Sequence, residues 1–284
     1  MEENKKSNKD RAGRFLVRVA LWVAIAVAMV PFVFLFITSI KPAGATQVIP
    51  PRWLFVPTLE NYAAVFGGQT AGSQAFLPLM VHSVIVAVAS TILTVILALP
   101  TAYALARVRF RGRRFLASWI LSTIMFPPIV AAIPVFVFAG ALRIVDTYPV
   151  LIIPYTAFNL PLVIWVLRSI IVQIPQEIEQ AALVDGCTRF GVIRRMIFPL
   201  AMPGIATGAI LSIILCWNEF LFALTLTRAN VKTAPVGISE FTGMFGTEWG
   251  NLTAASTAVV APILVMTLIL RRRLISGLTF GAVK

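Results

Sequence analysis

Few residues in this chain could carry out covalent chemistry. His82 is the only histidine among 284 residues, and Cys187 and Cys216 are the only cysteines. A structural zinc site usually takes four cysteine or histidine ligands at short spacings, so a site of this kind is excluded. A catalytic triad or a metal–histidine site would depend on His82 alone, with no nucleophile–base pair beside it. The pattern argues against an enzyme.

Nucleotide chemistry lacks its usual motif as well. A P-loop needs the pattern GxxxxGK[ST], whose glycines let backbone N–H groups surround the phosphates. The chain contains no such pattern. We therefore expect that the chain itself binds no nucleotide, no metal ion and no other cofactor.

A single acid could take part in transport. Glu219 lies within the otherwise uncharged residues 204–227, which are rich in aliphatic side chains. A carboxylate in such surroundings is costly and usually faces a cavity or a polar partner. Trp217, Asn218 and Glu219 are therefore candidates to line a translocation path or an outer gate. Structural pairing of Glu219 with Asn218 or with a neighbouring helix is the alternative.

The composition indicates which elements must position these residues. Hydrophobic residues make up 59% of the chain and charged residues 12%, about half the charged fraction of a soluble protein. The apolar residues come in long runs, and a helix needs roughly 20 such residues to cross the hydrocarbon layer. We therefore expect an all-α integral membrane protein.

Six largely uncharged stretches are long enough to cross a bilayer. The third contains Pro127, Pro128 and Pro134, and proline removes a backbone donor and clashes with the preceding turn. This stretch is therefore predicted to be kinked or broken. The six predicted spans are residues 19–40, 83–106, 115–142, 147–167, 204–227 and 250–270.

The basic residues predict the orientation of the spans. If the N-terminus lies inside, 19 Lys and Arg residues fall on the inner side and five on the outer side. This asymmetry satisfies the positive-inside rule and places both termini in the cytoplasm. It also accounts for the net charge of +13 without a nucleic-acid partner. Residues 1–13 are a polar cytoplasmic N-terminus, and residues 14–284 are a single transmembrane domain within the lipid bilayer.

Two outer loops are long enough to have structure of their own. Residues 41–80 contain several prolines and the segment TLENYAAVF, which could form a short helix beginning near Thr58. Residues 228–249 form the second loop. Both loops could contact an external partner, or they could only pack over the ends of the spans.

The stretch between the fourth and fifth predicted spans, residues 175–203, is too polar to span a membrane and too long for a tight turn. Pro175 suits the first turn of a helix, where its missing N–H is not needed. Gly186 is placed to end that helix in a left-handed conformation.

A second, amphipathic helix is predicted directly afterwards. Phe190, Ile193 and Ile197 would share its apolar face. Pro199 and Pro203 are expected to stop it before the fifth span. The sequence thus predicts a short helix–turn–helix on the inner face of the membrane.

This stretch resembles the EAA loop of importer-type ABC transporter permeases. In that family the pattern is Glu-Ala-Ala, three residues, Gly, nine residues and Ile-x-Leu-Pro. This chain departs from it at Gln180, which carries no charge, and at Met196 and Phe198, which replace aliphatic residues. The residues that match the ATPase-docking positions of the family are Glu179, Gln180, Ala181, Ala182, Asp185, Gly186 and Pro199.

Other segments extend the resemblance over nearly the whole chain. The sequences SIKP at 39–42, NY at 61–62, WNEFLFALTLT at 217–227 and GLTFGAVK at 277–284 are similar to those of carbohydrate permeases of the maltose-system type. In those permeases an Asn usually precedes the Ser that begins the second span, and here that residue is His82.

The resemblance implies a type I ABC importer permease fold with a cytoplasmic coupling helix. The implied partners are a dimer of a separate ATP-binding subunit, which would hold ATP and Mg, and a second homologous permease subunit. An external solute-binding protein would deliver a sugar or polyol. The implied location is the prokaryotic cell inner membrane, and the chain would be a multi-pass transport subunit rather than an enzyme.

A secondary transporter or a channel subunit is the main alternative. Proton-coupled transport usually places several ionisable groups within the membrane, whereas the predicted spans contain only Glu219, with His82 at an edge. No internal repeat of the kind found in many secondary transporters is present. Copurification with an ATPase would separate the two alternatives.

Overall fold

The computed structural model describes residues 2–50, 52–68, 75–243 and 246–279. The described residues contain four helices that are long and apolar enough to cross a membrane, or six spans when each of two bent helix pairs is counted as one. The predicted all-α fold of about six transmembrane helices is confirmed. The end of the C-terminal segment 277–284 lies outside the described residues.

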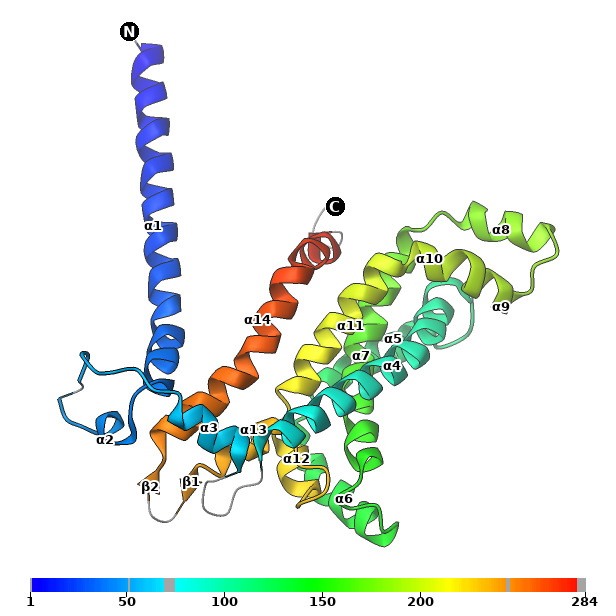
Figure 1. The fold of residues 1–284 in the computed structure, drawn as a ribbon. Coiled ribbons are helices and arrows are strands. Elements are labelled where there is room, and N and C mark those ends of the chain that lie inside the picture. The colour runs from blue at the N-terminus through cyan, green and yellow to red at the C-terminus, as the bar shows by residue number, and fades with distance from the viewer. Residues whose placement is uncertain (1, 51, 69–74, 244–245, 280–284) are drawn as a thin grey trace. The chain divides into compact units, whose positions relative to one another are not determined.

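The chain divides into two compact units. Unit 1 consists of residues 1–73 and 241–258, and unit 2 consists of residues 74–240 and 259–284. The elements of unit 1, labelled in Figure 1, are α1 (Glu2–Ser39), α2 (Ala43–Thr46), α3 (Glu60–Gly67), β1 (Thr242–Gly243), β2 (Gly246–Thr247) and the beginning of α14 (Trp249–Thr279).

The short helix predicted near Thr58 is confirmed as α3. It begins at Glu60, whose backbone N–H donates to Thr58 Oγ1 at 3.2 Å. It ends where Gly68 adopts φ +64°, a left-handed conformation that glycine takes without strain.

The side chain of Asn61 holds unit 1 together at the end of α1. Its Nδ2 donates to the carbonyl oxygens of Ser39 at 2.8 Å and of Lys41 at 2.7 Å. The hydroxyl of Tyr62 lies 2.7 Å from Ser39 Oγ. A Cβ atom on Gly250 would lie 2.4 Å from Asn61 Oδ1, so the helix can come this close only at a glycine. Two of the segments that carry the family resemblance are therefore in direct contact.

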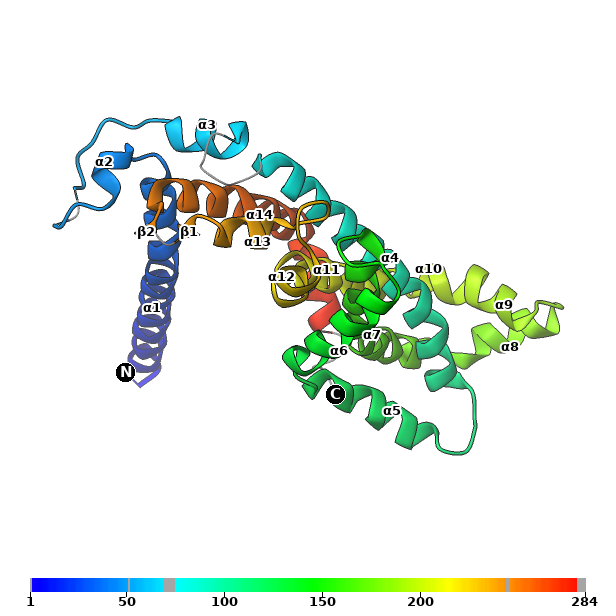
Figure 2. The ribbon, with the colours of Figure 1, turned by 90° about the horizontal axis from the view of Figure 1, so that it is seen from below.

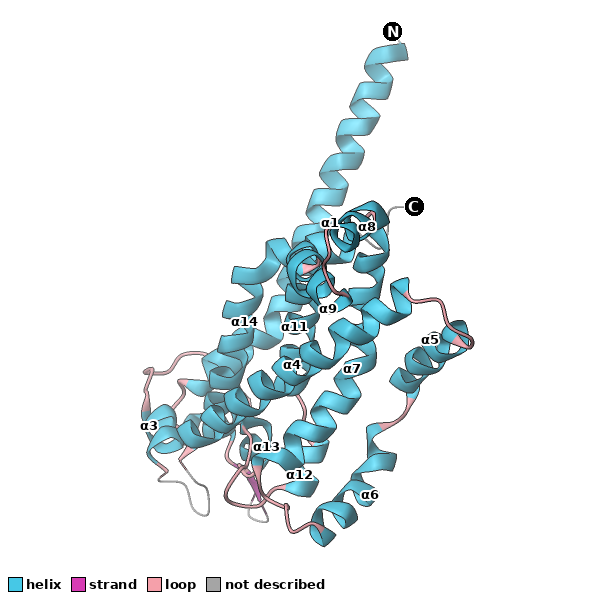
Figure 3. Ribbon diagram, turned by 90° about the vertical axis from the view of Figure 1, so that its right-hand side faces the viewer, coloured by secondary structure: helices cyan, strands magenta, loops and turns pink. Residues whose placement is uncertain are grey.

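Three helices form the centre of unit 2: α4 (Phe76–Arg107), α7 (Tyr148–Gln173) and α11 (Met202–Trp217). They pack side by side (Figure 3) around a shared apolar core. The other elements of unit 2 are α5 (Arg113–Ser122), η1 (Thr123–Met125), α6 (Pro128–Ala141), α8 (Gln176–Val184), α9 (Arg189–Val192), the π-helical turn η2 (Ile193–Ile197), α10 (Phe198–Leu200), α12 (Leu221–Leu226), α13 (Ala234–Ser239) and the remainder of α14.

Helices α7 and α11 approach each other closely at two glycines. A Cβ atom on Gly204 would lie 2.3 Å from Ile170 Cδ1, and one on Gly208 would lie 3.1 Å from Val163 Cγ1. Small residues four positions apart on one face allow two helices in a membrane to pack tightly. Neither helix can shift against the other without disturbing these contacts.

The third predicted span is broken, as its prolines indicate. One half, α5 with η1, makes an angle of 91° with the other half, α6. Pro127 precedes α6 and Pro128 begins it, at a position where a missing N–H costs no helix hydrogen bond. The prediction of a kink or break is confirmed.

The fifth predicted span, residues 204–227, is not one helix. Helix α11 ends at Trp217 and α12 begins at Leu221, with Glu219 in the break between them. The break has a local cause, because the Glu219 carboxylate accepts the first N–H groups of α12 and so starts a new helix.

Helices α4 and α7 are longer than the spans predicted for them. Helix α4 begins at Phe76 rather than at residue 83, so His82 lies inside the helix instead of before it. Pro78 stands in its first turn, where proline is tolerated. Helix α7 runs to Gln173, beyond the predicted end at residue 167.

Candidate functional site

The helix predicted with Pro175 in its first turn is present as α8, but it begins one residue later, at Gln176. Pro175 precedes it in an extended conformation, with φ −56° and ψ 134°. Glu177 and Glu179 occupy the first turn, where the helix dipole favours acidic side chains.

The end of α8 is fixed by a left-handed glycine, as predicted. Gly186 has φ +84°, and its N–H donates to the carbonyl oxygen of Leu183 at 3.1 Å. The N–H of Cys187 donates to the carbonyl oxygen of Ala182 at 2.9 Å. These two bonds form the Schellman motif, which satisfies the last carbonyl groups of a helix.

The second predicted helix is present but differs in form. It begins after Thr188, whose Oγ1 accepts a hydrogen bond from the Gly191 N–H at 3.1 Å. It continues through η2 and α10 and ends at Leu200, between Pro199 and Pro203, at an angle of 77° to α11, so the prediction that these prolines stop it before the fifth span is confirmed. Proline has no N–H and crowds the carbonyl group four residues earlier, and the chain responds with a wider, π-helical turn before it.

The apolar face predicted for this second helix is only partly right. Ile197 is fully buried and Ile193 is half-buried, but Phe190 is 72% exposed and Val192 is buried in its place. A π-helical turn takes more residues than an α-helical turn, so it rotates the residues before it relative to those after it.

A buried ion pair holds one face of α8 against α4. Arg107 Nε donates to Glu179 Oε1 at 2.5 Å, and the two side chains are only 6% and 8% exposed. The hydroxyl of Tyr103 donates to Glu179 Oε2 at 3.0 Å. Both carboxylate oxygens of Glu179 are thus bonded to α4.

The same arginine ties α4 to the end of α7. Its Nη2 donates to the carbonyl oxygens of Ile171 at 2.7 Å and of Ile174 at 2.5 Å. Carbonyl groups at a helix C-terminus lack partners within the helix and favour a cation. The guanidinium of Arg107 therefore joins α4, α7 and α8.

Ala182 lies on this buried face of α8. It is 4% exposed and belongs to the same apolar core as Leu105 of α4, Leu167 of α7 and Ile197 of η2. The expectation that Ala182 meets a partner protein is therefore corrected, because its side chain packs against its own chain.

The opposite face of α8 is exposed and partly apolar. Ala181 is exposed, Val184 is 87% exposed, and Phe190 follows on α9. Figures 1 and 2 show α8 and α9 next to each other, beyond the ends of α7 and α11. Of the residues predicted to dock, Gln180, Ala181, Asp185, Gly186 and Pro199 are exposed, whereas Glu179 and Ala182 are buried.

The three residues predicted to line a translocation path or an outer gate lie at the other end of α11. Two of them donate hydrogen bonds to backbone carbonyl groups of this chain. Trp217 is buried, and its Nε1 donates to the carbonyl oxygen of Val259 at 3.2 Å. Asn218 Nδ2 donates to the carbonyl oxygen of Ile214 at 2.8 Å, one turn earlier in α11.

Glu219, the third of these residues, caps α12. Its Oε1 accepts the N–H of Phe222 at 2.9 Å, and its Oε2 accepts the N–H of Ala223 at 3.3 Å. Glu219 therefore bonds to a neighbouring helix and not to Asn218. Its carboxylate positions the break between α11 and α12.

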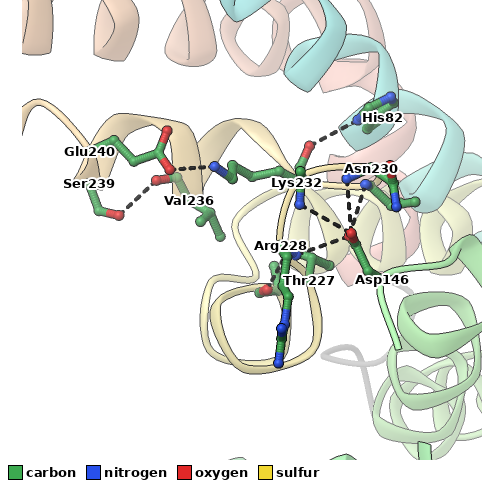
Figure 4. A network of polar contacts seen from close by, with 12 residues as sticks. His82, Asp146, Thr227, Arg228, Asn230, Lys232, Val236, Ser239 and Glu240 are labelled. Carbon is green, nitrogen blue, oxygen red and sulfur yellow. Dashed lines mark hydrogen bonds and ion pairs between the residues drawn. The ribbon is translucent and has the colours of Figure 1, made fainter. Parts of the chain in front are cut away.

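A carboxylate that the sequence analysis did not single out fixes the turn of residues 228–231. The Asp146 carboxylate accepts all four backbone N–H groups of this turn, at 3.0–3.2 Å, as Figure 4 shows. Burial by itself raises the pKa of the Asp146 carboxyl, but the four donors outweigh it and hold the pKa below its ordinary value.

Lys232 follows this turn and links it to two helices. Its carbonyl oxygen lies 3.1 Å from His82 Nδ1 of α4, and its ammonium group pairs with Glu240 at the end of α13 (Figure 4). The imidazole ring of His82 also meets the ring of Tyr148 edge-on, with centroids 5.8 Å apart. The single histidine thus takes part in holding this loop.

A cavity lies beside the break in the third span. Its volume is about 510 Å³. The rings of Phe126 and Phe158 are 6.4 Å apart and face it together with two hydroxyl-bearing side chains. The lining residues are Ser122, Thr123, Met125, Phe126, Pro127, Ala157, Phe158 and Pro161.

Sequence reasoning missed Arg107 and Asp146. Arg107 is one of several arginines expected on the inner side, and nothing in its spacing marks it as the partner of Glu179. Asp146 did carry a signal, because it is the only acid between Glu60 and Glu177. A lone acid in a short connection between two apolar stretches needs donors, and the backbone of residues 228–231 supplies them.

A family model matches residues 95–278, and its description is binding-protein-dependent transport system inner membrane component. The chain is 37% identical over 268 residues to the trehalose transport system permease protein SugB of Mycobacterium tuberculosis, covering 92% of this chain and 94% of that protein. It is 34% identical over 273 residues to the trehalose/maltose transport system permease protein MalG of Thermococcus litoralis, covering 95% and 97%.

One solved structure with a similar fold is a chain of a bacterial ABC transporter involved in the import of the acidic polysaccharide alginate. The TM-score is 0.75, and the match covers 93% of this chain and 97% of that chain at 22% identity. At this level of identity the likeness concerns the fold.

Proposed function

Because this chain belongs to the family of binding-protein-dependent transport system inner membrane components, we propose that it is the permease subunit through which a sugar or polyol enters the cell in an ATP-driven importer. The observation that carries this proposal is the division of α8 into two faces. Glu179 and Ala182 fix one face to the membrane helices, while Ala181 and Val184 leave the other face free for a partner.

The names of the relatives support the substrate class. Two relatives that match almost the whole chain are named for the transport of trehalose and of trehalose and maltose. The cavity beside the broken span has suitable chemistry, because a sugar ring stacks on aromatic faces and exchanges hydrogen bonds with hydroxyl groups. We assign Phe126 and Phe158 to the wall of the sugar path.

The charge asymmetry supports an orientation with both termini in the cytoplasm. The end of unit 2 that carries α8 also carries Arg107, Arg109, Arg111, Arg113 and Arg114 in one short segment. Positively charged segments of this kind remain on the cytoplasmic side. In this orientation α8 faces the compartment in which ATP is available.

ATP hydrolysis would take place on a dimer of a separate subunit that binds ATP and Mg. The exposed face of α8 and α9 supports docking into a cleft of that subunit, because clustered exposed apolar and aromatic side chains are typical of binding surfaces. The residues to which we assign docking are Gln180, Ala181, Val184, Asp185, Gly186, Phe190 and Pro199.

Glu179 would carry the motion of the docked helix into the membrane. Its carboxylate is bonded to Arg107 and Tyr103 of α4, and Arg107 is bonded to the last carbonyl groups of α7. Helix α11 would move together with α7, because the two helices are in close contact at Gly204 and Gly208. A displacement of α8 would therefore move these helices as one rigid body.

Two further partners complete the proposed importer. Backbone groups freed at a break inside a membrane must meet protein or water rather than lipid, so the break at Pro127 supports a second homologous permease beside it. The turn of residues 228–231, fixed by Asp146, is a preformed surface for an external solute-binding protein. A preformed surface loses little conformational entropy on binding.

The test is uptake of labelled trehalose, maltose and a panel of polyols by a strain that lacks the chain and receives it back on a plasmid. We expect uptake that requires the binding protein and the ATP-binding subunit, and copurification of that subunit with the tagged chain. Uptake that continues without the ATP-binding subunit and stops when the proton gradient is collapsed would show a secondary transporter instead.

A further inference from the structure

We propose that the connection from α4 to α5, the first turn of α5 and Arg168 of α7 form a binding site for the phosphate group of an anionic membrane lipid. A cavity of about 650 Å³ lies here, and its lining is mainly polar. We call it the arginine pocket. The residues that line it are Arg109, Phe110, Gly112, Arg113, Arg114, Phe115 and Arg168.

The positive charge of the arginine pocket is not neutralised within the part of the chain that the structure describes. The ion pairs found there are Arg107–Glu179 and Lys232–Glu240, and neither includes a pocket residue. Arg113 and Arg168 donate hydrogen bonds to backbone carbonyl groups at the end of α4. Four guanidinium groups that share a cavity and form no ion pair with a described residue favour an anion with several acceptor oxygens.

The start of α5 adds backbone donors to the same place. This helix has ten residues and begins at Arg113, directly after Gly112, which has φ +83° and supplies no capping side chain. The first turn of α5 contains no acidic residue. The first N–H groups of a helix lack partners within it and attract phosphate groups. Gly112, Arg113, Arg114 and Phe115 all line the pocket, so helix end and guanidinium groups act on one ligand.

The aromatic residues around the pocket favour a lipid as the source of the phosphate. Phe115 is 76% exposed and Phe110 is 41% exposed. Trp165 is 43% exposed, and the guanidinium of Arg168 lies 5.5 Å from its ring centroid. Exposed aromatic rings beside basic groups at the ends of membrane helices are typical of the lipid interface. A soluble anion would gain nothing from these rings, whereas acyl chains would cover them.

The test compares two double variants of the assembled transporter in nanodiscs of phosphatidylcholine with a labelled phosphatidylglycerol. The pocket variant is Arg109→Gln/Arg114→Gln, which removes two exposed charges that make no hydrogen bond to a described residue. The control variant is Arg111→Gln/Arg194→Gln, which removes the same charge from two exposed arginines outside the pocket. Neither pair includes a residue assigned to docking or a residue that bonds to Arg107 or Glu179.

We expect the apparent dissociation constant for phosphatidylglycerol to rise about thirtyfold in the pocket variant and to change little in the control. Equal losses in both variants would reduce the effect to general surface charge and overturn the proposal. Displacement of the lipid by an excess of inorganic phosphate would assign the site to a free anion and overturn it. Loss of the ATP-binding subunit with unchanged lipid binding would assign the pocket to an acidic protein surface and overturn it as well.

Discussion

Arg107 and Glu179 form an ion pair in which neither side chain is more than 8% exposed, and it joins two helices with different proposed tasks. Arg107 ends α4, a membrane helix, and Glu179 lies on α8, the helix proposed to meet the ATP-binding subunit. A buried charge that loses its partner typically costs about 3–5 kcal/mol. Substitutions in this pair should therefore show how much the contact between α4 and α8 contributes to the stability of the fold.

Removal of one partner of this pair should destabilise the protein strongly. We expect Glu179→Gln or Arg107→Gln to lower the free energy of unfolding by about 3 kcal/mol or more. The double variant Arg107→Met/Glu179→Leu should lose less than either single variant, because it leaves no unpaired charge. The measurement is thermal unfolding in detergent beside membrane abundance.

The matched control for this prediction is the pair of Lys232 and Glu240, whose side chains are 14% and 30% exposed. An ion pair with this access to water contributes about 0–1 kcal/mol, so Glu240→Gln should have little effect. Equal losses in Glu179→Gln and Glu240→Gln would contradict the importance assigned to burial.

Two adjacent alanines should respond differently to the same enlargement. Ala182→Leu adds volume to a packed core and should cost about 1–3 kcal/mol of stability, seen as lower abundance. Ala181→Leu adds volume on the exposed face and should leave abundance unchanged while lowering ATPase copurification and sugar uptake. Normal uptake in Ala181→Leu at normal abundance would mean that this face does not dock.

The effect of a substitution at Gly186 should depend on the backbone conformation of the new residue and not on the size of its side chain. A Cβ atom there would meet nothing within 4 Å, but the residue has φ +84°. A residue other than glycine held in the left-handed region costs roughly 1–3 kcal/mol. We expect uptake to fall in Gly186→Val and less in Gly186→Asn, because asparagine enters this region more readily. Equal uptake in the two variants would show that the left-handed cap has no role in coupling.

Asp146 should hold the turn of residues 228–231 in a way that depends on pH. Asp146→Asn removes the charge and one of the two acceptor oxygens. A hydrogen bond to a charged group contributes about 1.5–3 kcal/mol, and less at a partly exposed site such as this one. Hydrogen exchange of the amides at 228–231 should become faster. The same substitution at the exposed Asp185 should leave these amides unchanged.

The pH dependence follows from the lowered pKa of the Asp146 carboxyl. A group whose pKa is lower in the folded state stabilises that state fully above its unfolded pKa, about 3.9 for an aspartate. The stabilisation is lost as pH falls below that value and through the folded pKa. Protection of the turn should therefore stay constant from about pH 8 to pH 5 and fall under acid, and it should not follow this course in Asp146→Asn.

Glu219 should act through the structure of α12 rather than through its charge. Glu219→Gln keeps one carbonyl acceptor for the cap and should assemble and transport nearly normally. Glu219→Ala removes the cap and should cost about 1 kcal/mol of stability. Strongly reduced uptake in Glu219→Gln, at normal abundance and ATPase copurification, would instead place the carboxylate in the translocation path.

The parts of this fold that follow local rules could be predicted from the sequence. The broken third span follows from Pro127 and Pro128, and the end of α8 follows from Gly186, because each effect depends on a residue and its immediate neighbours. The number of spans follows from apolar length in the same way.

The parts that depend on distant pairing could not be predicted. The partner of Glu179 lies 72 residues earlier in the chain, and the donors to Asp146 lie more than 80 residues later. No spacing rule connects such residues. The break before α12 was missed for a different reason. Glu219 bonds locally, to the N–H groups three and four residues ahead, but an acid within a membrane usually indicates function and was interpreted in that way.

The close approach of Gly250 to Asn61 affects the order in which the parts of the fold can form during synthesis. Unit 1 combines residues 1–73 with residues 241–258, whereas residues 74–240 of unit 2 form one continuous run. At a synthesis rate of about 5–20 residues per second, Gly250 is made roughly 10–40 seconds after Asn61. During that interval α1 and α3 are already made, and the contacts among α4, α7 and α11 have all their residues before Gly250 exists. The central helices of unit 2 can therefore pack before unit 1 is complete, and Asn61 has to remain without Gly250 in the meantime.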